Sequence, residues 1–355
     1  MTIRLNKKAT KKDIARITSF LKENGFDYHV APGKTTTLIC IVGEETEKAE
    51  LLKSIGSFQG VDSVKLVNEP YRLISRRLRP EYNGKTKLIK VKTKEKIVEI
   101  GKKPVIIAGP CTVYNLEQIL DIANSIKEDA DILRGGAFKP RTSPYDFQGL
   151  GKSALEMLAI AREQTSLPVI TEVMDTRDIE LVASYADILQ IGARNMQNYP
   201  LLREAGKQKK PVMLKRHPYS SLKEWLCAAE YIAKEGNENI ILCERGIRTT
   251  TNGEYDRNTI DLAVISAAKE KTFLPVIVDP SHGTGRKELI ESATLSALTF
   301  HADGVIIEVM RNNEKPVIEY VNGKNKRRKA AYCDYAQSIT ISEFRKLAKK
   351  IRKTY

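Results

Sequence analysis

The residues PVIIA at 104–108 begin a strict alternation of short apolar runs and helical stretches, and this alternation decides the fold. Seven further apolar runs follow, namely ADIL (130–133), PVIT (168–171), ILQIG (188–192), PVML (211–214), IILC (240–243), PVIVD (275–279) and GVIIEV (304–309). Short continuous apolar runs are typical of parallel strands that are buried on both faces. Eight such strands, each followed by a helix over about 250 residues, predict an α/β fold, the (β/α)8 or TIM barrel. A doubly wound open sheet is the alternative, although no G-x-G-x-x-G motif follows the first strand.

The first 67 residues follow a different pattern. The strand-like segments TIRL, DYHV, TTLICIVG and VDSVKLV alternate with two helical stretches, KKDIARITSFLKENG and AELLKSIG. The first helical stretch carries Ile14, Ile17 and Leu21 at helical spacing. The order βαββαβ predicts a ferredoxin-like domain, in which two helices cover one face of an antiparallel sheet.

A connector separates this small domain from the barrel. Its segments TKLIKVKT and KIVEIG predict a short hairpin that caps whatever follows. We therefore divide the chain into a ferredoxin-like domain (1–67), a connector with a capping hairpin (68–103) and a barrel (104–355). A length of 355 residues suits one small and one large domain.

The composition limits the class of protein and its compartment. No apolar run reaches the length of a membrane span, and the opening residues MTIRLNKKATKKD lack an apolar signal core. We therefore expect a cytoplasmic protein that does not bind membranes. The five cysteines form no C-x-x-C pair, so we expect their thiols to be reduced. The net charge of +15 fits a local site for phosphorylated substrates. Because aromatic residues are not interleaved with the basic ones, we do not expect nucleic-acid binding.

Polar residues recur where the predicted strands end. They are Cys111, Arg134, Lys139, Glu172, Arg194, Lys215, Arg216, Glu244, Arg245, Asp279, His282 and Glu308. In a TIM barrel the C-terminal ends of the strands form the active site. We therefore expect one barrel mouth to hold all of these side chains.

The densest group of anion-binding residues is the segment LRGGAFKPRTSPYDFQGLG at 133–151. Its paired glycines let backbone N–H groups approach an anion closely, and the neighbouring side chains add charge and hydroxyl donors. The donors are Arg134, Lys139, Arg141, Thr142 and Ser143, which are more than one phosphate requires. We interpret the segment as part of a site for two phosphorylated molecules; a solvated basic loop is the alternative.

Four residues form a candidate metal site. Cys111, His282 and Glu308 follow predicted strands, and Asp334 lies on the segment beyond the last strand. Sulfur, nitrogen and oxygen donors together suit Mn²⁺, Fe²⁺, Co²⁺ or Zn²⁺ better than Mg²⁺ or Ca²⁺. The four residues are far apart in the sequence. The residues alone therefore leave open a structural Cys111 and a His282 that only hydrogen-bonds its own turn.

Six motifs resemble those of the 3-deoxy-D-arabino-heptulosonate 7-phosphate (DAHP) synthases, in the subgroup with an N-terminal ferredoxin-like domain. They are AGPC (108–111), the segment 133–151, QIGARN (190–195), LKR (214–216), ILCERGIRT (241–249) and VDPSHGTGR (278–286). The resemblance covers essentially the whole chain. Its most discriminating part is KPRTS, because related synthases of 3-deoxy-octulosonate 8-phosphate typically carry KANR there.

The resemblance implies a transferase, a 3-deoxy-7-phosphoheptulonate synthase, which condenses phosphoenolpyruvate with erythrose 4-phosphate and releases phosphate in the first step of the shikimate pathway. It places phosphoenolpyruvate among Arg134, Lys139, Arg194, Lys215 and Arg245. It places erythrose 4-phosphate against Arg141, Thr142 and Ser143. The implied ligands of a divalent transition metal are Cys111, His282, Glu308 and Asp334, and the candidate catalytic residues are Lys139, Lys215 and His282. A paralogue that uses another aldose phosphate and a non-catalytic regulatory paralogue are the alternatives.

The chain departs from the family pattern in two places. LKR is followed by His217 and Pro218 where the family usually has Gly, and the aspartate ligand lies further from the last strand than usual. The intervening segment VIEYVNGKNKRRKAAY predicts a β-hairpin around Asn322-Gly323 with a basic tip. The resemblance further implies a homotetramer whose N-terminal domain binds an aromatic amino acid, with oligomerisation alone as the alternative role.

Overall fold

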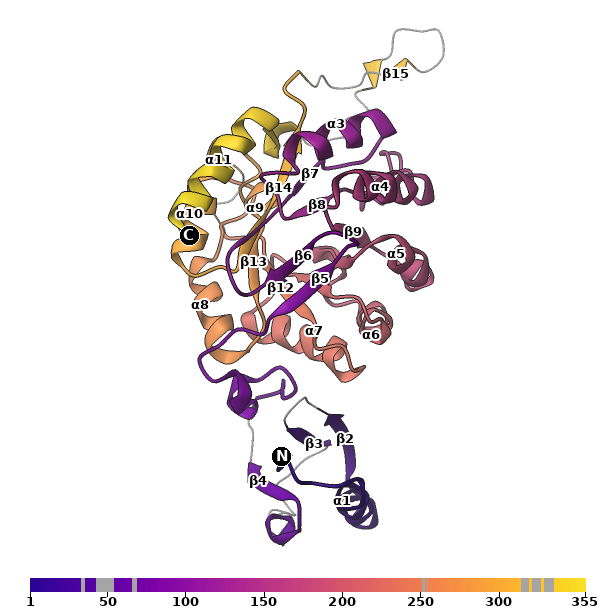
Figure 1. Cartoon of the computed structure of the whole chain (residues 1–355), viewed down its shortest axis with the longest axis vertical. Coiled ribbons are helices and arrows are strands. Elements are labelled where there is room, and N and C mark those ends of the chain that lie inside the picture. The colour runs from indigo at the N-terminus through magenta and orange to yellow at the C-terminus, as the bar shows by residue number, and fades with distance from the viewer. Residues whose placement is uncertain are drawn as a thin grey trace.

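The structure is a computed structural model of the 355-residue chain. It describes residues 1–32, 36–42, 54–65, 69–250, 253, 255–313, 319–320, 327–328 and 335–355. A barrel ringed by helices forms the larger part, and the N-terminal sheet lies outside the ring beside helix α7 (Leu222–Lys234) (Figure 1). Among the described residues no helix is long and apolar enough to cross a membrane.

The barrel contains the eight predicted parallel strands. They are β7 (Val105–Gly109), β8 (Ile132–Arg134), β9 (Val169–Val173), β10 (Ile188–Ile191), β11 (Val212–Lys215), β12 (Ile240–Glu244), β13 (Val276–Val278) and β14 (Gly304–Met310). Each strand pairs with the next, and β14 pairs with both β13 and β7. This closure confirms the TIM barrel and excludes the doubly wound open sheet. The strand interiors are buried on both faces, which is why they read as uninterrupted apolar runs.

Helices cover the outside of the barrel. They are α3 (Leu116–Ile126), α4 (Lys152–Thr165), α5 (Ile179–Tyr185), α6 (Tyr199–Lys207), α7, α8 (Leu262–Lys271), α9 (Pro280–Thr284), α10 (Lys287–Thr299) and α11 (Ile341–Thr354). Several begin at side-chain caps; Ser221 and Thr340 form capping boxes with Glu224 and Glu343 at the starts of α7 and α11. Single 3₁₀ turns complete the connections at Ile55–Ser57, Arg76–Leu78, Pro80–Tyr82, Thr176–Asp178, Ala193–Asn195 and Tyr335–Gln337.

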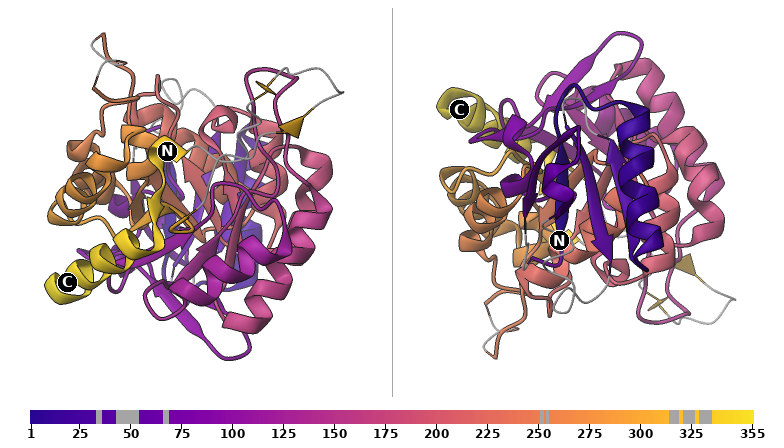
Figure 2. Two further views of the ribbon diagram at one scale, coloured as in Figure 1. Left: turned by 90° about the horizontal axis from the view of Figure 1, so that it is seen from above. Right: turned by 90° about the horizontal axis from the view of Figure 1, so that it is seen from below.

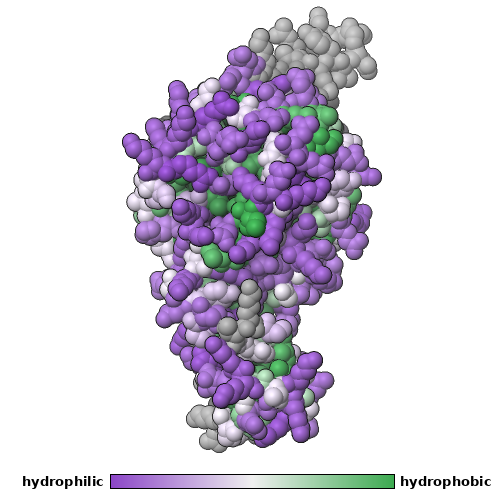
Figure 3. All heavy atoms as spheres, viewed as in Figure 1, coloured by the Kyte–Doolittle hydropathy of each residue, from purple (hydrophilic) through white to green (hydrophobic). Residues whose placement is uncertain are grey.

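The predicted capping hairpin closes the N-terminal end of the barrel. Its strands β5 (Ile89–Lys92) and β6 (Ile97–Ile100) pair antiparallel, with Val91 opposite Val98. The inward-facing side chains of the hairpin join one hydrophobic cluster with the side chains that fill the barrel. Figure 3 shows that the surrounding surface is mostly hydrophilic, with hydrophobic residues over this hairpin, where Leu88 and Ile97 are exposed.

The N-terminal sheet has the ferredoxin-like strand order. Strands β1 (Thr2–Leu5), β2 (Asp27–Pro32), β3 (Thr37–Val42) and β4 (Val61–Lys65) form an antiparallel sheet in the order β2-β3-β1-β4. Helix α1 (Lys11–Glu23) buries Ile17 and Leu21 against it, as the spacing predicts. The predicted second helix falls mainly on residues 49–53, which lie outside the described residues. The view from below in Figure 2 places this sheet in front of the barrel.

A buried carboxylate joins the N-terminal sheet to the barrel. Glu230 on α7 accepts hydrogen bonds from the backbone N–H groups of Arg72, Leu73 and Ile74, at 2.7, 2.7 and 3.2 Å. The Arg72 guanidinium in turn donates to the carbonyls of Met1, at 3.0 Å, and Ile41. Burial raises the pKa of Glu230, although these backbone donors oppose the shift. Arg72 and Glu230 therefore connect the small sheet to helix α7.

The chain beyond β14 contains short strands and the last helix. Strands β15 (Glu319–Tyr320) and β16 (Arg327–Arg328) pair antiparallel, in agreement with the predicted hairpin, whose turn at Asn322-Gly323 lies outside the described residues. Strand β17 (Ile339–Thr340) then pairs parallel with β14. This pairing returns the chain to the end of β14 where Glu308 lies.

Candidate active site

A cavity of about 550 Å³ opens at the C-terminal end of the barrel strands. Cationic side chains outnumber carboxylates in its lining. The cations are Arg134, Lys139, Arg141, Arg194, Lys215, Arg245, Arg248 and Arg257, and the carboxylates are Asp146 and Glu172. Such a surface attracts dianions, because the uncompensated positive charge creates a favourable potential inside the hollow.

Lys139 and Cys111 form a close pair on one wall. The ammonium group lies 2.9 Å from the Cys111 sulfur and 3.1 Å from the Cys111 carbonyl oxygen. Burial lowers the pKa of Lys139, but the charges of Cys111 and Glu308 outweigh it, so the pKa is raised and the ammonium form is favoured. Gly136 makes this approach feasible, because a Cβ there would lie 2.4 Å from the Cys111 carbonyl oxygen.

Two buried carboxylates anchor cations across the floor of the cavity. Glu308 pairs with Arg134 at 2.5 Å and faces His282 Nε2 at 3.2 Å. Asp279 contacts His282 Nδ1 at 2.8 Å and Lys215 at 2.5 Å. Burial alone would raise the pKa of Asp279, but His282 and Lys215 hold it well below its usual range. These contacts fix the positions of the cations with respect to one another.

Two other cations of the cavity, Arg194 and Arg245, have no carboxylate partner among the described residues. Arg194 donates only to the Pro140 carbonyl, at 3.3 Å, and Arg245 forms neither an ion pair nor a side-chain hydrogen bond there. Burial lowers the pKa of Arg245. A largely desolvated guanidinium without a partner favours an anionic ligand.

Residues 139–142 also line the cavity. Arg141 donates to the carbonyl of Phe147 at 3.2 Å, and Thr142 lines the cavity beside it. The Ser143 hydroxyl accepts from the backbone N–H of Tyr145 at 3.3 Å. Ser143 itself is not among the lining residues, so its placement toward a ligand stays a prediction.

The donor set at Glu308 fits a divalent metal. If the proton of His282 lies on Nδ1 toward Asp279, then Nε2 presents a lone pair to Glu308. The two acceptors face each other at 3.2 Å, beside the Arg134 guanidinium that pairs with the same Glu308 oxygen, and they can together ligate a metal ion. Cys111, which Lys139 contacts, adds a soft donor at the same end of the barrel. In the part of the chain that the structure describes, no three His, Cys, Asp or Glu residues form a metal-ligating group, and Asp334 lies outside it.

Comparison with known proteins places this geometry in a family. The DAHP synthetase I family matches residues 88–353, and the DAHP synthase ferredoxin-like domain matches residues 1–69. The chain belongs to the DAHP synthetase I family. The resemblance, the fold and the enzyme class that the motifs predict are thereby confirmed.

Solved and curated relatives agree with this family. The chain is 36% identical to the phospho-2-dehydro-3-deoxyheptonate aldolase of Thermotoga maritima, over 99% of this chain and 97% of that protein. A crystal structure of that DAHP synthase has a TM-score of 0.72 at 37% identity, over 99% of this chain and 96% of that one. The 2-dehydro-3-deoxyphosphooctonate aldolase of Syntrophotalea carbinolica is 29% identical, over 71% of this chain and 91% of that protein. The ferredoxin-like part is thus shared with the heptonate relative.

The expectation that one mouth holds every strand-end residue is wrong for Arg216 and Glu244. They pair with each other at 3.1 Å, Arg216 also pairs with Asp261 at 2.9 Å, and neither lines the cavity. Cys111, Asp279 and Glu308 do not line it either, but each contacts a cation that does. Successive residues of a strand face opposite sides, so Lys215 points into the mouth and Arg216 toward the surrounding helices. Burial raises the pKa of Glu244, against the effect of Arg216.

Sequence reasoning missed a buried relay that contacts Glu308. Gln337, which is buried, donates from Nε2 to Glu308 at 2.6 Å and accepts from Arg257 at 2.5 Å. Arg257 lines the cavity, so the relay links its opening to its floor. Arg248 was missed as a lining residue although it lies in the motif ILCERGIRT. No strand-end position marks Gln337 in the sequence, and its role follows only from the return of the chain at β17.

Proposed function

We propose that the chain condenses phosphoenolpyruvate with erythrose 4-phosphate and water to give 3-deoxy-D-arabino-heptulosonate 7-phosphate and phosphate, the first step of the shikimate pathway. One observation carries the proposal: in a chain of this family, the described lining of the barrel mouth has eight Lys and Arg side chains against two carboxylates, an excess that suits two phosphorylated substrates. The proposal places the reaction in the cytoplasm.

Phosphoenolpyruvate is assigned to the deeper half of the cavity. Its carboxylate and phosphate need at least two separate cationic groups, and the cavity supplies Arg134, Lys139, Lys215 and Arg245, with the exposed Arg194 at its edge. Arg245, without a protein partner there, is the natural ligand for the phosphate. The buried pairs at Glu308 and Asp279 hold the remaining cations in place before substrate binds.

Erythrose 4-phosphate is assigned to the outer half. Arg141, Thr142 and Ser143 offer a bidentate guanidinium and two hydroxyls to its phosphate. With the phosphate held near the opening, the aldehyde reaches inward toward C3 of phosphoenolpyruvate. The KPRTS sequence, rather than the KANR typical of octulosonate synthases, favours the four-carbon aldose.

A divalent transition metal, Mn²⁺, Fe²⁺, Co²⁺ or Zn²⁺, is proposed at Cys111, His282, Glu308 and Asp334. When bound there, it would supply Lewis-acid polarisation of the aldehyde oxygen. The Cys111 thiol and the Asp279-oriented imidazole support this assignment. Equilibrium dialysis checks it directly: Cys111→Ser should weaken metal binding by about 100-fold, with the fold judged by circular dichroism, and unchanged binding would refute the assignment.

The chain's own residues handle the protons of the reaction. As C3 of phosphoenolpyruvate bonds to the aldehyde carbon, the aldehyde oxygen becomes an alkoxide and takes a proton from the ammonium group of Lys139 or Lys215. Water then adds at C2, loses a proton, and the resulting hemiketal phosphate releases its phosphate group. His282 is the third candidate catalytic residue; held through Nδ1 by Asp279, it would direct Nε2 to the metal.

The test measures consumption of phosphoenolpyruvate and release of phosphate with a panel of aldose phosphates, before and after chelator. Activity with erythrose 4-phosphate that is lost with chelator and restored by one of the four metals supports the proposal. Preference for arabinose 5-phosphate would instead identify a paralogue of the octulosonate type, to which the 29% relatives belong. No turnover with any aldose phosphate would identify a non-catalytic regulatory protein.

Residues 1–67 are proposed to regulate a homotetramer by binding an aromatic amino acid. The family match over residues 1–69 and the separate docking through Arg72 and Glu230 support a distinct unit. The sheet lies beside α7 and not over the barrel mouth of its own chain (Figure 1). Inhibition would therefore require a shift of this unit or a neighbouring copy, driven by differential affinity of the effector. If activity is insensitive to tyrosine and phenylalanine, and deletion changes only the oligomeric state, the unit serves assembly alone.

A further inference from the structure

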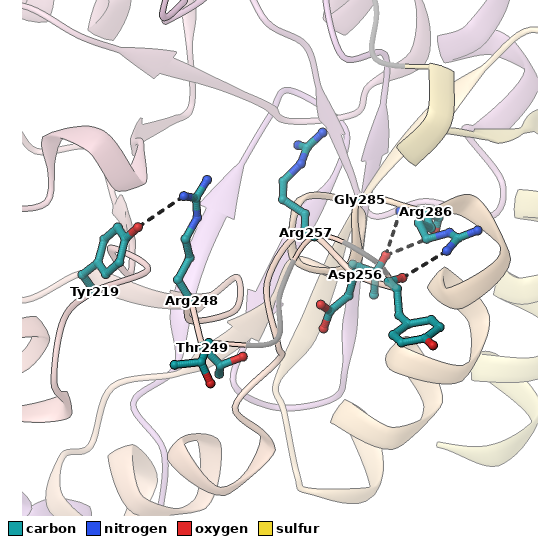
Figure 4. Close-up of a pocket in the computed structure, with 11 residues that line it drawn as sticks. Tyr219, Arg248, Thr249, Asp256, Arg257, Gly285 and Arg286 are labelled. Carbon is teal, nitrogen blue, oxygen red and sulfur yellow. Dashed lines mark hydrogen bonds between the residues drawn. The ribbon is translucent and has the colours of Figure 1, made fainter.

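A second hollow of about 1010 Å³ lies beside the barrel mouth. The loops that follow β11, β12 and α9 enclose it, and Figure 4 shows residues that line it. The lining residues are Tyr219, Arg248, Thr249, Thr250, Gly253, Tyr255, Asp256, Arg257, Thr284, Gly285 and Arg286. None of the residues assigned above to either substrate or to the metal belongs to this set.

The hollow carries excess positive charge. Among its described lining residues, three are arginines, Arg248, Arg257 and Arg286, and one is a carboxylate, Asp256. The Asp256 carboxylate accepts from the Thr259 hydroxyl at 3.2 Å. No described carboxylate pairs with Arg248 or Arg257, so no group in the described part of the chain compensates their charge.

Neutral partners hold two of these guanidinium groups in place. Arg248 donates to the Tyr219 hydroxyl at 3.2 Å, a contact drawn in Figure 4. Arg257 donates to Gln337 at 2.5 Å. A guanidinium oriented by a neutral acceptor keeps its full charge and its remaining N–H donors for a ligand. The same close-up shows the Arg248 and Arg257 side chains extending in the same direction (Figure 4).

The hollow is continuous with the active-site cavity. Tyr219, Arg248 and Arg257 line both. These shared residues form the boundary between the hollow and the barrel mouth. An anion could therefore move from one to the other while remaining in a region of positive electrostatic potential.

We propose that this hollow is a second anion-binding site, which takes a phosphate dianion at Arg248 and Arg257 at the edge of the barrel mouth. The ligand is either inorganic phosphate or the phosphate group of a monoester, since both offer the oxygens that guanidinium groups bind. The binding site stands on the hollow and its charge alone. Its use, to capture the aldose phosphate on entry or to hold released phosphate on exit, rests on the proposed function.

The test is a calorimetric titration of inorganic phosphate into the full-length chain, which is first saturated with phosphoenolpyruvate. An Arg141→Ala background removes phosphate binding at the aldose half-site, so the site that remains is the outer one. Adding Arg248→Gln or Arg257→Gln to this background should weaken the remaining phosphate binding at least threefold, a size typical of exposed charge contacts. Arg203→Gln, which removes the same charge from a guanidinium stacked over Tyr231 on the outer helices, should leave it unchanged.

A gentler variant separates loss of the site from loss of structure. Tyr219→Phe removes only the hydroxyl that orients Arg248, at a side chain that is 68% exposed, and should weaken phosphate binding by a smaller factor. Identical phosphate isotherms for the background and for both arginine double variants would overturn the proposal. Failure of the proposed function would show in a separate titration, in which phosphoenolpyruvate added to the unliganded chain would produce no heat of binding. The comparison of phosphate binding between the background and the arginine double variants would still test the second site.

A second arm identifies the physiological source of the anion. The same titration uses glycerol 3-phosphate, a monoester that has no aldehyde to react. Tighter binding of the monoester supports a capture site for the incoming aldose phosphate, whereas tighter binding of inorganic phosphate supports a release site. Binding of neither ligand to the Arg141→Ala background overturns the proposal.

Discussion

The two ends of the barrel are built from the same eight strands but have opposite chemistry. At the N-terminal end, Ile89, Val91, Val98 and Ile100 of the hairpin are each at most 5% exposed and pack against apolar strand residues. At the C-terminal end the strands lead into a cavity lined by cations. The contrast teaches that the two requirements, stability and charge, are met at separate ends of one scaffold.

The charged end is unfavourable for folding. Like charges repel at short range, and each buried cation loses hydration. Glu308 and Asp279 offset part of this cost by contacting Arg134, Lys215 and His282. The apolar end also offsets the cost of the buried cations, because burying one large aliphatic side chain stabilises the fold by about 1.5–3 kcal/mol.

The largest expected effect contrasts two lysines at opposite ends of strand β11. Lys215→Met removes a cation that contacts Asp279 and lines the cavity, so we expect turnover to fall by about 10³-fold. Lys210 precedes the same strand, is 39% exposed and lies 3.9 Å from Asp187. Lys210→Met should leave turnover unchanged. Steady-state assays of both variants compare the two ends, and equal losses would show that the division is wrong.

The second prediction targets the apolar end. Ile100 is fully buried under the barrel, so Ile100→Ala should lower the free energy of unfolding by about 2–5 kcal/mol. The KM for phosphoenolpyruvate should not change, because the site is at the other end. Ile97 lies on the same strand but is 60% exposed, and Ile97→Ala should have little effect on stability. Denaturant titration of both variants measures the difference; a raised KM in Ile100→Ala would mean that the ends are coupled.

The sequence predicts the apolar end better than the charged one. Each of the eight apolar runs became a strand because buried parallel strands leave an unbroken apolar signature. The segments TKLIKVKT and KIVEIG predict the capping hairpin. These features depend on residues that are close together in the sequence, so they can be recognised without knowledge of the fold.

The charged end depends on contacts between distant segments. Strand position alone did not distinguish Lys215, which faces the cavity, from Arg216, which faces Glu244. Gln337 reaches Glu308 only because β17 pairs with β14 after a long excursion of the chain. Neither fact has a local signature, since both depend on the direction in which a side chain leaves the folded backbone.

The third prediction divides the charged end into its two proposed half-sites. Arg141→Ala should raise the KM for the aldose phosphate by about 10–100-fold, because one charge-assisted contact to phosphate is lost. The dissociation constant of phosphoenolpyruvate should change much less, whereas Lys215→Met should show the reverse. Initial-rate kinetics with each substrate varied, together with calorimetry for phosphoenolpyruvate, provide the comparison. Equal effects of both variants on both substrates would show that the half-sites are wrongly assigned.

The smallest expected effect concerns the contact of the N-terminal sheet with the barrel. Arg72→Met removes the guanidinium that donates to the carbonyls of Met1 and Ile41, while the backbone N–H groups that bind Glu230 remain. A net loss of about 1 kcal/mol should speed amide exchange in β1 and β3 about fivefold, with the barrel strands unchanged.

Arg77→Met is the matched control, since Arg77 lies on the same connector and is exposed. If an aromatic amino acid inhibits the enzyme, Arg72→Met should weaken inhibition without changing the uninhibited rate, because the effector acts through the position of this sheet. Exchange rates in β1 and β3 that match those of Arg77→Met would show that Arg72 does not hold the sheet. Regulation would then have to act through the other surfaces of the N-terminal unit, independently of the contact with α7.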